Sequence, residues 1–409
     1  MTADEWTRLS LEVSKVFTPA APIGAQQLFA GRLEQLRQVV DVIQQMGQHV
    51  MLFGERGVGK TSLANVIAVT FGSGKGILAV RRNCDSSDTY STLWGKIFSD
   101  ITLTRKIKKI GFSDNVECKS FTVSDQFVGN ISPDNVRQAL TGLSSQCTPI
   151  IIIDEFDRIS GTETRSTMAD TIKMLSDHAV QATIIIVGVA DSVDQLIKEH
   201  QSIERALVQI KMPRMSNIEL EKIICTGVNL LKMTIDDDAK RHIALLSQGL
   251  PHYTHLLGLH ATREAIDHKE KRITFGHVES AISKAIQQAQ HTILTAYNKA
   301  TASPRRDNLY EHVLLACALA DTDDLGYFPA ANVREPLSKI MDKVYNIPSF
   351  SRHLNDFCDG ERGPILNKIG KQRRYRFRFI NPLMQPFVVM HGISAKSIDS
   401  PLLELSAKK

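Results

Sequence analysis

The chain has 409 residues, 43% of them hydrophobic and 23% charged, with a formal net charge of +5. This length exceeds one compact core and predicts two or three domains, with the composition of an ordinary soluble globular protein. Uncharged apolar runs stay far below the roughly 20 residues of a membrane helix, and Met1 to Ser10 lacks an apolar signal core, so we expect a cytoplasmic protein with no membrane partner. The six cysteines have no CxxC spacing, which disfavours a zinc site or disulfide framework and favours free thiols.

Apolar strands and amphipathic helices alternate through the first half of the chain, after a lead-in over residues 1–30. Helical periodicity begins at Leu33. Strands are expected at residues 49–53, 77–81, 149–153 and 183–189. The last two carry β-branched residues on both faces, as a parallel sheet covered by helices requires. Residues 102–130 break this rhythm with a basic cluster and a possible hairpin, and we interpret them as an insertion.

The second half of the chain is mainly helical. From Met215 the helical pattern continues to about Gln290. The last hundred residues hold three helical segments and then a strand pair near residues 365–380, an order that suggests a winged helix. We therefore expect an α/β domain at 1–213, a helical domain at 214–290, a winged-helix domain at 291–395 and a loosely held tail at 396–409.

A glycine-rich loop follows the first strand. Gly54-Glu55-Arg56-Gly57-Val58-Gly59-Lys60-Thr61 fits GxxxxGK[ST] at every fixed position, with a strand before it and a helix after it. Glycines let backbone amides turn inward around a phosphate, and the following helix adds its positive end. The pattern predicts that Lys60 contacts the β- and γ-phosphates, that Thr61 coordinates Mg²⁺, and that the loop with Ser62 binds ATP or ADP. The alternative is a glycine-rich turn with an incidental lysine.

An acidic pair follows the third expected strand. Asp154 and Glu155 come directly after four consecutive isoleucines. Carboxylates at the end of a buried strand are costly without a nearby cation, so we expect Asp154 to hold Mg²⁺ and Glu155 to polarise the attacking water as a catalytic residue. The alternative is an exposed strand end. Asp157 and Arg158 are expected to form a surface pair.

These two motifs and their surroundings resemble AAA+ ATPases, and especially the origin-recognition and replication-initiator group and related bacterial transposition ATPases. The resemblance spans about residues 28–290 and continues more weakly to 390. It implies an α/β fold: a P-loop AAA+ domain with a parallel sheet flanked by helices, an all-helical lid and a C-terminal winged-helix domain. Phe29-Ala30-Gly31-Arg32 resembles the segment that packs near the adenine, which implies that Arg32 binds the nucleotide.

Two further catalytic residues are implied by this resemblance. The strand Ile184–Val187, followed by Asp191, resembles the sensor-1 strand, which places a polar residue near the γ-phosphate; the alternative for Asp191 is a helix N-cap. Ser202-Ile203-Glu204-Arg205 resembles the segment that carries an arginine finger. Arg205 would then reach the γ-phosphate bound to a neighbouring subunit, which implies a homo-oligomer. The alternative is a surface arginine paired with an acid.

Gly249-Leu250-Pro251-His252 lies where the sensor-2 helix begins in this group, so Pro251 and His252 are expected to contact the nucleotide. The initiators often carry an arginine in this helix, whereas this chain offers His252 and His255. The Gly-x-Pro also resembles the equivalent element of signalling P-loop ATPases of the STAND type, in which the proline lies against the base. Both likenesses stay open.

A basic segment near the C-terminus alternates with aromatic residues. Its cations are Lys368, Lys371, Arg373, Arg374, Arg376 and Arg378. Period-2 alternation predicts that Tyr375, Phe377 and Phe379 lie on one face of a strand and the arginines on the other. In a winged helix this strand would lie along a DNA backbone, while residues 349–357 would form the helix that enters the major groove. Six phosphate contacts would give a slope of log K against log salt of ~−5. The alternative is a solvated face or an acidic partner protein.

The sequence thus predicts an ATPase that binds ATP or ADP with Mg²⁺, oligomerises through Arg205, associates with double-stranded DNA through Lys371, Arg373, Arg374, Arg376 and Arg378, and recruits or regulates a separate effector protein. The alternative function is a signalling ATPase in which nucleotide exchange on a monomer activates an effector, for example in anti-phage defence.

Overall fold

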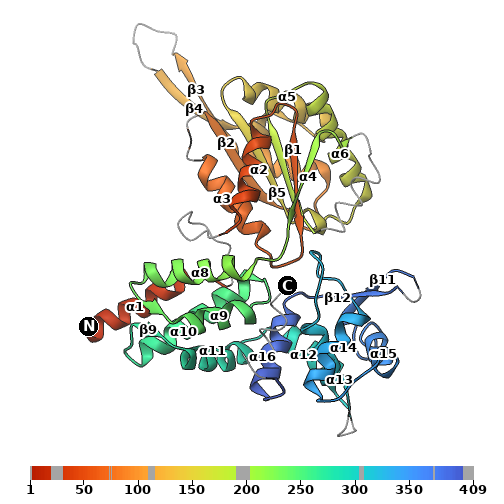
Figure 1. The fold of residues 1–409 in the computed structure, drawn as a ribbon. Helices are drawn as coiled ribbons and strands as arrows, with labels where there is room; N and C mark the ends of the chain where they lie inside the picture. The colour runs from red at the N-terminus through yellow and green to blue at the C-terminus, as the bar shows by residue number, and fades with distance from the viewer. Residues whose placement is uncertain are drawn as a thin grey trace.

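The computed structural model describes residues 2–19, 31–72, 74, 76–108, 116–189, 203–303, 308–371 and 374–398. An α/β domain occupies the upper part of the molecule, and two mainly helical parts lie side by side below it (Figure 1). Within the described residues, every helix is too short or too polar to span a bilayer.

The α/β domain is built on a five-stranded sheet in the order β2-β5-β6-β1-β7, with each neighbouring pair parallel. The strands are β1 (His49–Gly54), β2 (Ile77–Asn83), β5 (Thr148–Asp154), β6 (Thr183–Gly188) and β7 (Leu207–Met212). Because all the strands run the same way, the segments that follow β1, β5 and β6 meet at one edge of the sheet. The predicted parallel sheet is confirmed for four of its strands, and the fifth strand, β7, was not expected from the sequence.

Helices cover both faces of this sheet, because successive strand residues point to opposite sides. Ile150 and Ile152 pack with one set of helices, and Ile151 and Ile153 with the other. The first set comprises α2 (Leu33–Ile43) and α3 (Lys60–Gly72). The second comprises α4 (Tyr90–Ser99), α5 (Pro133–Ser144) and α6 (Thr162–Asp177).

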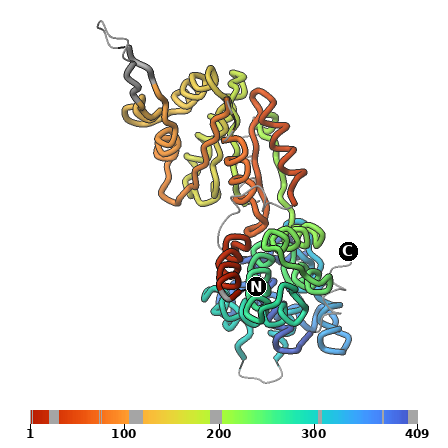
Figure 2. The backbone as a smooth tube through the Cα atoms, turned by 90° about the vertical axis from the view of Figure 1, so that its left-hand side faces the viewer, coloured from red at the N-terminus to blue at the C-terminus, as the bar shows by residue number. Residues whose placement is uncertain are grey.

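The segment where the insertion is expected contains an antiparallel hairpin. Its strands are β3 (Thr102–Lys108) and β4 (Val116–Thr122), in a register that pairs Thr102 with Thr122. A short 3₁₀ helix, η2 (Val123–Gln126), follows it. The hairpin projects away from the body of the domain (Figures 1 and 2).

The second part of the molecule is a helical lid below the carboxyl edge of the sheet. Its helices are α8 (Asn217–Leu230), α9 (Asp237–Leu246), α10 (Pro251–Asp267) and α11 (Phe275–Gln287). A short parallel pair, β8 (Thr234–Ile235) and β9 (Arg272–Ile273), joins two of its loops.

The N-terminal residues pack on this lid and not on the sheet. Helix α1 (Ala3–Val16) lies against α10, and its apolar side chains belong to the core shared by the lid. The Phe17 ring fills a notch that glycines leave open: a Cβ would come within 2.5 Å of the ring at Gly227 and 2.8 Å at Gly258. Helix α1 was expected within the α/β domain at 1–213, whereas in the structure its apolar face is buried against the lid.

The third part combines helices with a small sheet. Its helices are α12 (His291–Thr301), α13 (Tyr310–Ala318), α14 (Ala330–Ile340), α15 (Ile347–Asp356) and α16 (Met384–Ser394). An antiparallel sheet in the order β10-β12-β11 packs on them, with β10 (Phe328–Pro329), β11 (Leu366–Ile369) and β12 (Arg376–Phe379). This arrangement fits the predicted winged helix. Of the expected tail, residues 399–409 lie outside the described residues.

Candidate nucleotide site

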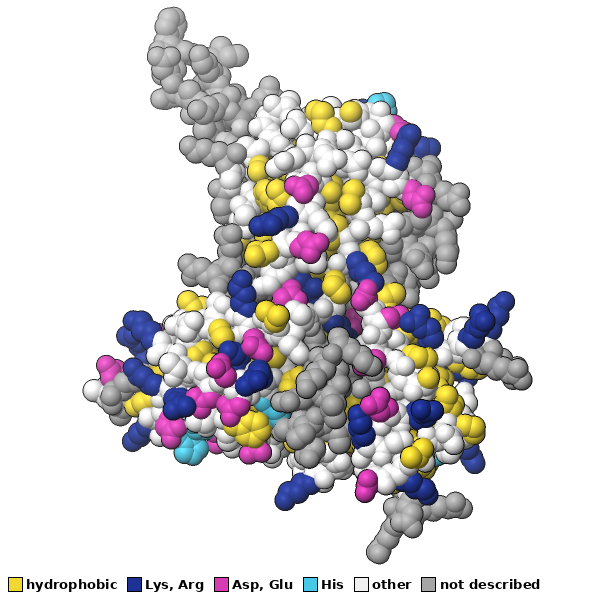
Figure 3. All heavy atoms as spheres, in the orientation of Figure 1, with side chains coloured by type: hydrophobic (Ala, Val, Ile, Leu, Met, Phe, Trp, Pro, Cys, Tyr) yellow, Lys and Arg dark blue, Asp and Glu magenta, His cyan; other side chains and the backbone are white. Residues whose placement is uncertain are grey.

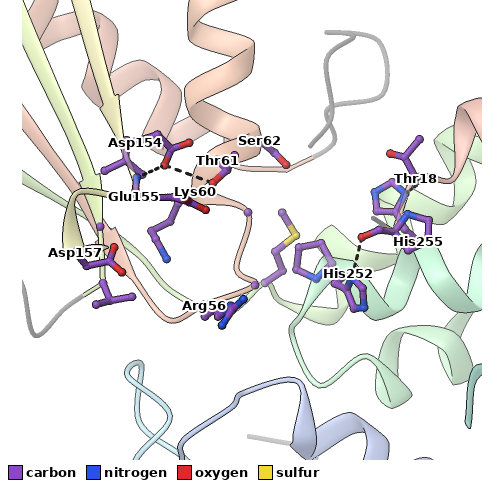
Figure 4. A pocket seen from close by; sticks show the side chains of 18 of the residues that line it. Thr18, Arg56, Lys60, Thr61, Ser62, Asp154, Glu155, Asp157, His252 and His255 are labelled. Atoms are coloured by element: carbon purple, nitrogen blue, oxygen red, sulfur yellow. Dashed lines mark hydrogen bonds between the residues drawn. The ribbon is translucent and has the colours of Figure 1, made fainter. Parts of the chain in front are cut away.

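A pocket of about 710 Å³ lies between the carboxyl edge of the sheet and the lid (Figure 4). The loop after β1 contributes Arg56, Gly57, Gly59, Lys60, Thr61 and Ser62 to its lining. The ends of β5 and β6 contribute Asp154, Glu155, Asp157, Arg158 and residues 187–189. The opposite wall comes from Thr18 and Pro19 and from the lid residues Met215, Ile223, Pro251, His252 and His255.

The glycine-rich loop has the backbone that its sequence predicts. Gly57 and Gly59 have φ values of +88° and +95°, a region that side chains rarely tolerate. Helix α3 then begins at Lys60, so its amino end faces the pocket. The Lys60 ammonium donates to the carbonyl oxygens of Gly54 at 3.0 Å and Glu55 at 2.7 Å. Burial lowers the pKa of Lys60 to about 8, against the opposing effect of nearby Asp157 and Asp154.

The two predicted magnesium ligands lie together. Thr61 Oγ1 is 3.5 Å from Asp154 Oδ1, and the Asp154 side chain is only 2% exposed. A hydroxyl and a carboxylate oxygen beside a phosphate-binding loop are the hard ligands that Mg²⁺ prefers, so the residues present fit this ion.

Glu155 adopts an unusual backbone conformation at the mouth of the pocket. Its φ is +57°, which is uncommon for a residue with a side chain and often marks a functional position. Its carboxylate pairs with Arg158 at 3.0 Å. The predicted surface pair of Asp157 with Arg158 is therefore wrong: the 3₁₀ turn η3 (Phe156–Arg158) brings residues three apart together, and Asp157 lines the pocket.

Some predicted nucleotide-binding residues lie behind the loop and do not face the pocket. Val58 is buried in the core of the sheet domain. Arg32 is 3% exposed and donates to the carbonyls of Val58, at 3.3 Å, and Pro213. Burial lowers the Arg32 pKa, while Glu219 opposes that shift. Arg32 thus supports the loop from the side away from the pocket.

Glu55, the second residue of the loop, also faces away from the pocket. Its carboxylate is 2% exposed and accepts two hydrogen bonds from Arg214, at 2.6 and 3.2 Å. Arg214 lies in the link between β7 and the lid, and it also donates to Gln385 Oε1 of α16 at 2.7 Å and to the Gln248 carbonyl at 3.2 Å. The phosphate-binding loop, the lid and the C-terminal part therefore meet at one guanidinium group.

Sequence reasoning missed Arg81 as a site residue. This arginine of β2 donates to Asp154 Oδ2 at 2.8 Å, within the predicted magnesium site. The available signal was a basic pair near the end of a half-buried strand, but only the pairing of β2 with β5 identifies the partner of Arg81.

The lid wall of the pocket is tied to the N-terminal segment by two histidines. The N–H of Thr18 donates to His255 Nδ1 at 3.3 Å, and His252 Nδ1 lies 2.8 Å from the Pro19 carbonyl. Burial lowers the pKa of His252 and lowers that of His255 to about 4. Both rings are therefore neutral at pH 7. Pro251 and His252 line the pocket as expected, whereas Thr18 and Pro19 were not singled out.

The two expected γ-phosphate residues have different outcomes. Asp191 lies outside the described residues. Arg205 precedes β7, at the opposite edge of the sheet from the loop at 54–61, and its side chain is 79% exposed and pairs with Asp177 at 3.1 Å. In this arrangement Arg205 is far from the pocket of its own chain.

The basic strand has its predicted alternation. In β12 the buried Phe377 and Phe379 alternate with Arg376, which is exposed, and Arg378, which is half-buried. Lys371 and Arg374 precede this strand and are exposed, and Arg373 lies outside the described residues. Figure 3 shows Lys and Arg side chains near the end of this small sheet. Two of its arginines are already engaged within the protein: Arg376 pairs with Asp323, and Arg378 lies 4.5 Å from the centre of the Tyr327 ring.

Comparison with known proteins identifies the class. Residues 50–214 match the family model described as "ATPase family associated with various cellular activities (AAA)". The chain therefore contains an AAA ATPase domain, and it is an ATPase with the fold expected from the sequence.

Two solved structures extend the likeness over nearly the whole chain. The ORC2 protein of Aeropyrum pernix, solved in complexes with ADPNP and ADP, superposes with a TM-score of 0.50 at 15% identity, covering 93% of this chain and 98% of that one. A Walker-type ATPase of Pyrococcus abyssi gives a TM-score of 0.51 at 14% identity, with 90% and 98% covered. At these identities the likeness defines the fold alone. A comparison with curated protein sequences gave no significant match.

Proposed function

We propose that this ATPase is a DNA-associated molecular switch, in which the nucleotide at the loop of residues 54–61 sets the position of the C-terminal winged helix. The observation that carries this proposal is the buried contact of Glu55 with Arg214 and of Arg214 with Gln385. It joins the phosphate-binding loop directly to the part of the chain that bears the basic strand.

The pocket residues have complementary roles in ATP hydrolysis. Lys60 neutralises phosphate charge, and Thr61 and Asp154 hold Mg²⁺, which supplies further charge stabilisation when bound. Glu155 lies at the pocket mouth and accepts the proton of the attacking water. Because Glu155 is paired with Arg158, this pair must open before Glu155 acts as a base.

The coupling runs through atoms that respond to the nucleotide. The Glu55 carbonyl accepts from Lys60, while its carboxylate accepts from Arg214. When Lys60 turns to a phosphate, the Glu55 carbonyl loses its donor and the loop readjusts. Gln385, which accepts from Arg214, is 3% exposed and donates to the Ala318 carbonyl of α13 at 2.8 Å. A shift of Arg214 would therefore change contacts inside the C-terminal core.

Other residues of the C-terminal part also pack against the loop of residues 54–61. Leu383 lies 3.4 Å from a Cβ built on Gly57, and the Leu383 carbonyl accepts from the lid residue Tyr253 at 2.8 Å. A Cβ at Gly326 would overlap the Glu55 carboxylate. The phosphate-binding loop therefore cannot shift without displacing packed atoms of the C-terminal part. Such packing favours two discrete conformations over a continuous range of conformations.

Duplex DNA fits the exposed cations of the basic segment at residues 368–378. Lys371 and Arg374 face solvent between β11 and β12, and Arg352 of the α15 helix is also exposed. Such cations fit phosphates at a groove edge. Asn355 of α15 accepts from Lys368 of β11 at 2.9 Å, which fixes the strand relative to the helix.

Assembly of subunits is the second part of the proposal. Arg205 is exposed at the edge of the sheet opposite its own pocket, so it is available to a neighbouring subunit's pocket. It would have to leave Asp177 to do so. A separate effector or machinery protein would then read the assembled state.

One observation favours the signalling alternative. Pro251 lines the pocket and its Cγ lies 3.8 Å from a Cβ built on Gly59, as a proline that senses the bound nucleotide would. On this alternative, release of the C-terminal part from the loop exposes an effector surface on a monomer, and DNA and Arg205 have no role.

The test compares the affinity for duplex DNA with a non-hydrolysable ATP analogue and with ADP. In the wild type the two affinities should differ by about 5- to 150-fold, as coupled sites do. Gln385→Leu removes the link to α16 and should bring the ratio towards one. Asp324→Asn is the matched control, because its exposed contact with Lys211 also joins the two parts but bypasses Glu55.

The outcomes distinguish the DNA-associated switch from the signalling ATPase. DNA binding with equal affinities in the wild type would refute the switch but keep the DNA contact. No DNA binding in either state, with tight nucleotide binding, would favour the signalling alternative.

A further inference from the structure

The guanidinium group of Arg81 is held by several hydrogen bonds at the pocket edge of the sheet. Its guanidinium group donates to acceptors on three elements: Asp154 of β5 at 2.8 Å, Asn83 of β2 at 3.1 Å and Asn65 of α3 at 3.4 Å. The register pairs Asn83 with Asp154, so the Arg81 side chain runs along β2 towards the pocket edge of the sheet. The side chain is 19% exposed, and among the described residues its buried Nε has no partner.

The contact divides the two oxygens of Asp154. Oδ2 accepts from Arg81, while Oδ1 accepts from the Glu155 N–H at 2.9 Å and from Thr61 Oγ1 at 3.5 Å. A buried carboxylate with one anchored oxygen cannot rotate freely. Arg81 on Oδ2, together with the Glu155 N–H on Oδ1, therefore sets which oxygen of Asp154 faces Thr61.

We propose that Arg81 is a positioning residue for magnesium: its guanidinium group holds Asp154 Oδ2 so that Oδ1 is presented beside Thr61 for the ion. This inference rests on the magnesium–nucleotide site proposed above. Groups that orient a metal-binding carboxylate typically affect metal affinity by 10- to 100-fold when removed.

A simple charge effect would have the opposite sign. A fixed cation near the site repels Mg²⁺, so if Arg81 acted by charge alone its removal would strengthen metal binding. The three acceptors around the guanidinium favour orientation, because only a planar fork reaches all of them, and a lysine ammonium does not reproduce that geometry.

The test measures how much Mg²⁺ strengthens nucleotide binding, as the ratio of the dissociation constants of a fluorescent ADP analogue in EDTA and in Mg²⁺. Arg81→Met should lower this ratio by about 10- to 100-fold and leave the affinity in EDTA within about twofold. Arg81→Lys keeps the charge but not the fork and should lower the ratio as well. Arg82→Met is the matched control, because the neighbouring Arg82 pairs with the exposed Asp100 instead.

A double variant tests whether Arg81 acts through Asp154. Asp154→Asn alone should remove the Mg²⁺ effect, and adding Arg81→Met to it should change nothing further. A folding defect would lower the bound fraction in EDTA and in Mg²⁺ alike, so it does not imitate a change in the ratio.

Three results would overturn the inference: an unchanged ratio in Arg81→Met, a higher ratio, or a ratio that Arg81→Lys fully preserves. Failure of the proposed function looks different, because the wild type itself would then bind no nucleotide or gain nothing from Mg²⁺.

Discussion

The Arg214→Met substitution probes the contact on which the proposed switch depends. It removes the guanidinium group and leaves the Glu55 carboxylate, which is 2% exposed, without its ion-pair partner. Breaking a buried pair from one side typically costs about 3–5 kcal/mol of unfolding free energy, because the remaining charge is desolvated and uncompensated. Gln385 Oε1 and the Gln248 carbonyl lose a donor at the same time, so we expect the upper part of that range.

A double-mutant cycle separates the ion pair from general damage to the region. Glu55→Met together with Arg214→Met removes both charges, and such replacements are often close to neutral. The double variant should therefore recover about 2 kcal/mol or more relative to Arg214→Met alone. Glu55→Gln should cost less than Arg214→Met, since the amide still accepts a hydrogen bond.

Urea unfolding followed by tryptophan fluorescence provides the measurement. The chain has two tryptophans, and Trp94 is fully buried in the sheet domain, whereas Trp6 lies on α1 beside the lid. In a Trp6→Phe background the signal reports the sheet domain alone, where Glu55 lies. A cost below about 1 kcal/mol for Arg214→Met, or strict additivity in the cycle, would refute the buried coupling.

Three further predictions concern catalysis, assembly and acid stability. Glu155→Gln should keep nucleotide binding and lower the hydrolysis rate by about 100-fold or more, measured as phosphate release, and a wild-type rate would exclude Glu155 as the base. Arg205→Ala should abolish the rise of the specific ATPase rate with protein concentration and spare ATP binding, whereas Asp177→Ala, which only frees Arg205, should not. Burial lowers the pKa of His49 and His255 from 6.5 to about 4, so the unfolded chain binds more protons between these values and stability falls as pH drops below about 6.5. Each ring contributes about 3 kcal/mol at most, and an unchanged urea midpoint between pH 7 and pH 5 would contradict this.

Local patterns were enough to predict the loop and four strands of the sheet, but not the edge strand β7. The spacing from Gly54 to Thr61 and the isoleucine run before Asp154 each lie within one short segment, so their chemistry is readable without knowing the fold. The winged-helix arrangement was likewise indicated by the order of its helices and strands. These features depend on neighbours in sequence.

Long-range contacts were not predictable in the same way. Arg81 contacts Asp154 only because β2 pairs with β5, and the sequence of neither strand predicts that pairing. Glu55 pairs with Arg214, which lies 159 positions later in the sequence. Phe17 packs into a notch formed by Gly227 and Gly258, which neither glycine reveals alone. In each case both residues could be seen in the sequence, but their contact depends on the topology of the fold and could not be predicted from local pattern.

The structure also changes the magnitude expected for DNA binding. All six cations of the basic segment would give a slope of log K against log salt of ~−5. Arg376 already pairs with Asp323, Arg378 lies over Tyr327, and Lys368 donates to Asn355 and lies over Tyr375, so none of the three is expected to release a counterion on binding. The three remaining cations predict a slope of about −3.

Two substitutions test this number by fluorescence anisotropy over a range of salt concentrations. Lys371→Ala should make the slope shallower by about 1, because the exposed ammonium contacts a phosphate. Asp323→Asn frees Arg376 and should make the slope steeper by about 1. A slope near zero in the wild type would exclude the segment as a DNA contact. A wild-type slope of about −4 that Asp323→Asn leaves unchanged would mean that Arg376 leaves Asp323 for DNA, and the ion pair would then be a contact that binding breaks.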